Sequence, residues 1–189
     1  MTQPSNEHEI TIAGGERLLV RPVRRDDEAK LAEMFVQASP EDIRFRCFGA
    51  VKDFPHVLAS RLTGIDPRNE QTLVAVAEEG DGGAIMGVVH IICERLHPDT
   101  AEYDIMVRSD YKGHGLGYRL MQEILAEARR RKLKAVEGYI MRENKTMVIM
   151  AREHGFKPVV EEDDMIIMRA ELADTDRVPG IEFSKLSPR

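Results

Sequence analysis

The sequence predicts one α/β domain (α+β in some schemes) with a mixed, mostly antiparallel sheet and helices on both of its faces. In the first half, apolar runs such as 85–95 and 101–107 are separated by short polar turns, which favours antiparallel hairpins. In the second half, strand and helix patterns alternate, and this supplies two crossover helices. The length of 189 residues suits a single compact domain with short tails.

Caps, prolines and glycines bound the elements expected in the first half. The first strand, at 17–22, ends at a proline, and the next three segments are helical because each begins at a capping residue or an apolar repeat. Three strands rich in β-branched residues follow. These elements are the strand 17–22, helices from Asp26 or Asp27 to Ala38, from Ser39, and over 54–62, and strands over 72–77, 85–95 and 101–107.

The second half is expected to add two helices and three strands. The first helix carries an apolar stripe at a spacing of three to four residues, and the second begins at an asparagine cap and ends at a glycine. These elements are a helix over 115–131, a strand over 135–141, a helix from Asn144 to His154, and a hairpin of 156–160 and 165–169. The expected domain covers 15–172, with flexible segments over 1–14 and 173–189.

Composition excludes several classes of protein. The net charge of −6 argues against non-specific nucleic-acid binding, which needs a basic surface. Cys47 and Cys93 are too few for a disulfide framework and lack metal-ligand spacing. The start of the chain has no apolar core typical of a signal peptide, and no apolar run reaches membrane-spanning length. We therefore expect a cytoplasmic protein with no nucleic-acid or membrane partner.

The most informative motif is a glycine-rich turn, Lys-Gly-His-Gly-Leu-Gly, at 112–117. It follows the apolar run 103–107 and precedes the amphipathic helix. Amides at a helix N-terminus lack intrahelical partners and carry partial positive charge, and glycine lets a phosphate approach them closely. The turn is therefore expected to bind a phosphate.

Two common phosphate loops do not fit this turn. A nucleotide P-loop requires Lys-Ser or Lys-Thr after its last glycine, whereas Tyr118 and Arg119 follow Gly117 here. A dinucleotide fold requires Gly-x-Gly-x-x-Gly in an early βαβ unit, whereas this turn is late and has a different spacing.

A third pattern does fit. Lys112, Gly115 and Gly117 resemble the acyl-CoA-binding signature of the GNAT N-acetyltransferase superfamily, although that family usually has Gln or Arg at the first position. Asn144 and the later Gly-Phe pair, 155–156, resemble a second family segment. The resemblance implies acetyl-CoA as acyl donor and no metal. It implies a cofactor site made of Ile105, Met106, Val107, Lys112, Gly113, Gly115, Leu116, Gly117 and Asn144.

Softer motifs narrow the resemblance. The segments 39–46 and 61–66 are similar to the N-terminal half of the acetyltransferase domain in bacterial Pat-type protein lysine acetyltransferases. The spacing of Asn144, Met147 and Ala151 before the Gly-Phe pair is similar too. The resemblance covers about 17–172.

The strand before the turn carries two candidate catalytic carboxylates. Alternation places Glu102, Asp104 and Met106 on one face. The resemblance implies that Glu102 is the catalytic carboxylate, with Asp104 as the alternative base. Many family members have a tyrosine proton donor where this chain has Ala151.

The expected function is transfer of an acetyl group to an amine, first of all the ε-amine of protein lysines. A small-molecule amine is the alternative acceptor, and a non-catalytic acyl-CoA-sensing module is the alternative class. The sequence leaves the acyl chain length and the oligomeric state open, with a homodimer as one option.

Overall fold

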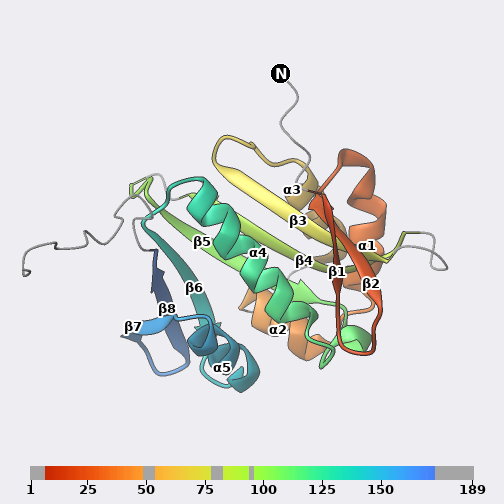
Figure 1. Cartoon of the computed structure of the whole chain (residues 1–189). Helices are drawn as coiled ribbons and strands as arrows, with labels where there is room; N and C mark the ends of the chain where they lie inside the picture. Colours follow the sequence, from red (N-terminus) through yellow and green to blue (C-terminus); the bar gives the residue numbers. More distant parts are fainter. Residues whose placement is uncertain (1–6, 49–53, 78–82, 94–95, 173–189) are drawn as a thin grey trace, which may run out of the picture.

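The computed structural model describes residues 7–48, 54–77, 83–93 and 96–172. These residues form one eight-stranded sheet with the strand order β1-β2-β3-β4-β5-β6-β8-β7. β5 and β6 are parallel, and the other neighbouring strands are antiparallel (Figure 1). The predicted fold class is therefore confirmed. The expected tail over 173–189 lies outside the described residues.

The helices and strands follow the expected order. The strands are β1 (His8–Thr11), β2 (Arg17–Pro22), β3 (Glu70–Ala77), β4 (Ile85–Cys93), β5 (Thr100–Val107), β6 (Ala135–Met141), β7 (Lys157–Glu161) and β8 (Met165–Glu171). The helices are α1 (Glu28–Val36), α2 (Pro40–Cys47), α3 (Phe54–Thr63), α4 (Leu116–Arg130) and α5 (Lys145–Glu153), with short 3₁₀ turns at Arg25–Asp27 and Ser109–Tyr111.

Two local expectations differ from the structure. Part of the segment 1–14, expected to be flexible, instead forms β1, which pairs with β2 and buries Ile10. Its pattern is too short to stand out in the sequence. The carboxylate of Asp27 does not cap α1, because it accepts hydrogen bonds from the Arg21 side chain and the Arg24 amide.

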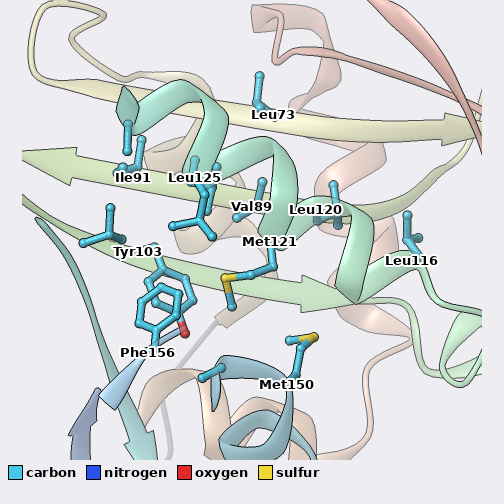
Figure 2. Close-up of a cluster of buried hydrophobic side chains, with 14 of the residues drawn as sticks. Leu73, Val89, Ile91, Tyr103, Leu116, Leu120, Met121, Leu125, Met150 and Phe156 are labelled. Atoms are coloured by element: carbon cyan, nitrogen blue, oxygen red, sulfur yellow. The ribbon is translucent and has the colours of Figure 1, made fainter. Parts of the chain in front are cut away.

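Helices cover both faces of the sheet. α4 crosses one face, where its leucines pack on strand residues such as Val89 and Ile91 in a large core (Figures 1 and 2). α1 and α3 cover the other face, where Phe35 and Leu62 join a second core. None of the helices in the described ranges has the length and apolar character needed to cross a membrane.

The two cores confirm the alternation expected along β5. Tyr103, Ile105 and Val107 belong to the core beneath α4, whereas Met106 belongs to the core beneath α1 and α3. β5 therefore carries residues of both cores, and its C-terminal end leads into the turn before α4.

Candidate active site

The site begins where two neighbouring strands part. β5 and β6 pair only from Thr100 to Glu102 and from Ala135 to Glu137 in the described structure. Beyond these residues the two strands diverge (Figure 1). The backbone of β5 that faces β6 thus lacks a strand partner there. Such a backbone can bind an extended ligand, because unpaired peptide groups need hydrogen-bond partners.

A cavity of about 700 Å³ lies along this fork. β5, β6, α2, α5 and the turn before α4 contribute its walls. The lining residues outside the predicted site are Glu41, Phe45, Arg46, Phe48, Tyr103, Tyr118, Gly138, Tyr139, Ile140, Thr146, Met147 and Met150, together with Asp42 and Tyr111. Every predicted site residue also lines the cavity except Leu116, whose side chain is buried in the core while its amide begins α4.

The glycine-rich turn has left-handed glycines and, among the residues that the structure describes, amides without backbone partners. Gly113 and Gly115 have φ angles of +79° and +83°, which residues other than glycine rarely adopt. Within the described ranges, no backbone hydrogen bond outside helices and strands is donated by Gly113, His114 or Gly115. The first amides of α4 add further donors, because the first turn of a helix has no intrahelical acceptors. The turn therefore presents a cluster of amides to the cavity.

Lys112 has a partner that the sequence did not suggest. Its ammonium group contacts the carboxylate of Asp42 on α2, which also accepts a hydrogen bond of 2.8 Å from Ser109. Burial alone would raise the pKa of Asp42, but the hydrogen bonds from Lys112 and Ser109 outweigh it and lower this pKa below its usual range. Lys112 thus joins α2 to the turn.

Replacing Lys112 with alanine should weaken acetyl-CoA binding by no more than about fivefold, the effect of a half-exposed ion pair. The backbone amides, which we expect to make most of the phosphate contacts, remain in this variant. Calorimetry on the variant would measure the change, with Lys157→Ala on the exposed β7 as the matched control. A hundredfold loss of affinity would instead assign phosphate binding to the Lys112 side chain.

The two candidate carboxylates differ in their surroundings. Glu102 lines the cavity at the last paired position of β5. Asp104 is tied into a network, with Arg46 Nη2 at 2.6 Å and His90 Nδ1 at 3.3 Å from its two carboxylate oxygens. Burial would raise the pKa of Asp104, but Arg46 and His90 outweigh it and lower this pKa. A lowered pKa makes Asp104 a weaker base than an ordinary carboxylate.

The network continues away from the cavity. His90 is 1% exposed, and its Nε2 lies 3.0 Å from Glu70 Oε2. Arg46 was not expected in the site, since a charged residue on a short polar helix normally faces solvent. No local pattern in the sequence brings Arg46 to Asp104, whereas the register of β4 and β5 places His90 and Asp104 side by side in the structure.

Asn144 and Tyr103 complete the site. Asn144 caps α5, with its Oδ1 accepting a hydrogen bond of 3.1 Å from the Met147 amide, and it also lines the cavity. Tyr103 is 4% exposed, and burial raises the pKa of its hydroxyl. No sequence pattern distinguishes Tyr103 from the other apolar residues of its strand.

Sequence comparison relates this chain to known acetyltransferases. A model of the acetyltransferase (GNAT) family matches residues 38–156, more than half of the chain. An acetyltransferase of Pseudomonas aeruginosa is 26% identical over 152 residues, which cover 79% of this chain and 80% of that protein.

Solved structures show the same fold. The GNAT domain of S. lividans PAT aligns with a TM-score of 0.80 and 22% identity, over 90% of this chain and all of that domain. YncA of Salmonella typhimurium, solved with its cofactor acetyl-CoA, aligns with a TM-score of 0.65 and 17% identity, over 83% of this chain and 95% of that one. The family match, together with a glycine-rich turn at a strand fork, shows that the chain belongs to the acetyltransferase (GNAT) family of acyl-CoA-dependent N-acetyltransferases.

Proposed function

We propose that this enzyme transfers an acetyl group from acetyl-CoA to the ε-amine of lysine residues in proteins, with Glu102 as the base. We further propose that residues 15–172 form the catalytic domain. The single observation that carries the proposal is the cavity itself. The glycine-rich turn and Glu102 both line this cavity, one at each end of the open edge of β5.

The residues present fit the donor. Gly113, Gly115 and Gly117 line the cavity and carry no Cβ, so a pyrophosphate can approach the backbone of the turn. The open edge of β5 from Ile105 to Val107 offers peptide groups to the pantetheine arm. Asn144 lines the same cavity, where its amide can contact the same arm.

The chemistry needs a proton acceptor. A lysine amine with a reference pKa near 10.4 is protonated at neutral pH, and freeing it costs about 4–5 kcal/mol at pH 7. In the proposed reaction the free amine attacks the thioester carbonyl, and the amine proton passes to the Glu102 carboxylate directly or through water. The C–S electron pair leaves with the sulfur, which is a tolerable leaving group without a tyrosine at position 151.

The rim of the cavity supports a protein acceptor over a small one. Phe48 at the end of α2 and Tyr139 on β6 both line the cavity and are 44% and 36% exposed. Exposed rings around a carboxylate form an open, apolar edge on which the stem of a lysine side chain can lie. The resemblance to Pat-type lysine acetyltransferases and the likeness to S. lividans PAT point the same way.

The test incubates the pure protein with radiolabelled acetyl-CoA and a cell lysate. Label on protein lysines is the expected result, and its loss in Glu102→Gln would tie the label to this cavity. Label on small molecules alone would favour the second acceptor class. Binding of acetyl-CoA without transfer to any acceptor would contradict the catalytic proposal and favour a sensing module.

A further inference from the structure

We propose that the ring of Tyr103 limits the length of the acyl group that this enzyme transfers. The proposal rests on the proposed function, because it concerns the donor end of the same cavity. Acyl groups longer than acetyl would meet the Tyr103 ring at the closed end of the strand fork. Tyr103 is therefore a specificity-determining residue, and the selectivity that it sets can be measured separately from the acceptor.

The position of Tyr103 follows from strand register. Pairing of β5 with β6 ends at Glu102 and Glu137, so Tyr103 and Gly138 are the first residues of the fork. From Val107 back to Tyr103, β5 rises about 13 Å. An extended pantetheine arm covers this span when its pyrophosphate lies on the turn at 112–117. The thioester then lies at the closed end of the fork, near Glu102.

The ring is seated on a glycine. A Cβ at Gly138 would lie 2.4 Å from Tyr103 Cε1 and 2.8 Å from its hydroxyl oxygen, so no larger residue fits there while the ring keeps its place. The Tyr103 ring also packs on Phe156, with a centroid distance of 5.3 Å (Figure 2). Tyr103 and Gly138 both line the cavity, whereas Phe156 does not. The ring thus forms a wall between the cavity and the core.

Packing alone holds this wall. Within the described residues, the buried Tyr103 hydroxyl has no hydrogen-bond partner. Because protein interiors are close-packed, a ring packed against both Gly138 and Phe156 has little freedom to move aside for a longer acyl chain. A smaller side chain at position 103 would leave apolar space in which the methylene groups of a longer acyl chain could be buried.

The reaction itself is the same for every acyl group. The C–N bond forms as the C–S bond breaks, the electron pair stays on the departing sulfur, and the amine proton goes to Glu102. Only the fit of the acyl chain changes. A rigid wall disfavours an acyl group that is one methylene too long by about tenfold or more in kcat/KM. Where apolar space is available, each methylene that becomes buried instead favours the longer acyl group by about fourfold.

The experiment compares kcat/KM for acetyl-CoA and butyryl-CoA in the wild type and in Tyr103→Leu. The wild type should prefer acetyl-CoA by at least about tenfold. In Tyr103→Leu, the ratio of butyryl to acetyl should rise by at least about fifteenfold, from two newly buried methylenes. Calorimetry with the two acyl-CoA compounds should show the same change in relative affinity without any turnover.

Two variants separate selectivity from general damage. Tyr103→Phe keeps the ring and removes a hydroxyl that has no partner, so its ratio should stay at the wild-type value and its unfolding midpoint should not fall. Leu125→Ala removes a leucine of the same core from α4 and should lower the midpoint without changing the ratio.

Three results would overturn the assignment. In the first, the wild type uses butyryl-CoA as well as acetyl-CoA. In the second, the butyryl-to-acetyl ratio of kcat/KM is the same in Tyr103→Leu as in the wild type. In the third, this ratio changes as much in Leu125→Ala as in Tyr103→Leu. A wild type that binds both compounds with the expected preference but transfers neither would contradict the proposed function and leave the wall supported.

Discussion

Glu102→Gln is expected to lower kcat by about 10²- to 10⁴-fold, which is the usual contribution of a general base. Glutamine has nearly the same shape but does not take up the proton that the acceptor amine must lose. The Kd for acetyl-CoA should stay close to the wild-type value, because the turn at 112–117 and the edge of β5 are untouched. Steady-state kinetics and calorimetry on the same preparation measure the two quantities.

Glu137→Gln is the matched control for this variant. Glu137 lies opposite Glu102 in the strand register, but it does not line the cavity, and its carboxylate pairs with Arg169. Its replacement should change kcat little. Turnover in Glu102→Gln equal to that of the wild type would remove Glu102 from catalysis, and a normal kcat with a raised Kd would make it a binding residue.

Asp104 is the weaker candidate for a physical reason that only the structure reveals. In the sequence, Glu102 and Asp104 are two acids on the same face of one strand. In the structure, α2 brings Arg46 to Asp104, and β4 places His90 beside it. An aspartate stabilised in its charged form by these partners is poorly suited to take up a proton.

The parts of the site that could be predicted are those set by local sequence. The positive φ angles of Gly113 and Gly115, the start of α4 and the cap at Asn144 each depend on a few neighbouring residues. Simple alternation along β5 predicted which of its side chains lie on which face of the sheet. These features explain why nearly all of the predicted residues line one cavity, because in this fold one strand, one turn and one helix are consecutive.

The remaining contacts join residues far apart in the chain. Asp42 meets Lys112 across 70 residues, and Arg44 of α2 pairs with Glu143 across 99. No local pattern encodes which of many surface charges will meet. α2 is a polar helix, and its charged side chains hold it to the turn, to β5 and to the loop before α5. The α2 wall of the cavity therefore depends on tertiary ion pairs that sequence patterns do not reveal.

Asp27→Ala is expected to destabilise the protein by about 3–5 kcal/mol, the usual result of breaking a buried ion pair. Arg21 and Asp27 are 5% and 3% exposed, and the guanidinium donates two hydrogen bonds of 2.6 and 2.8 Å to the carboxylate. Without Asp27, Arg21 keeps a hydrogen bond to the Pro22 carbonyl but loses its counter-charge. The Arg24 amide also loses its acceptor. Urea unfolding at neutral pH measures the change.

Two further variants and a pH series test the cause of this loss. Asp26→Ala, at the exposed neighbouring acid, should change stability by less than about 0.5 kcal/mol. Arg21→Met combined with Asp27→Ala should be more stable than Asp27→Ala alone, because no buried charge is left unpaired.

Burial would raise the pKa of Asp27, but Arg21 outweighs it and lowers this pKa, so the pair stabilises the fold above about pH 4. Its contribution is lost as the pH falls through the folded pKa. The difference between wild type and Asp27→Ala should therefore shrink below about pH 4, and a difference that stays constant in acid would contradict the ion-pair explanation.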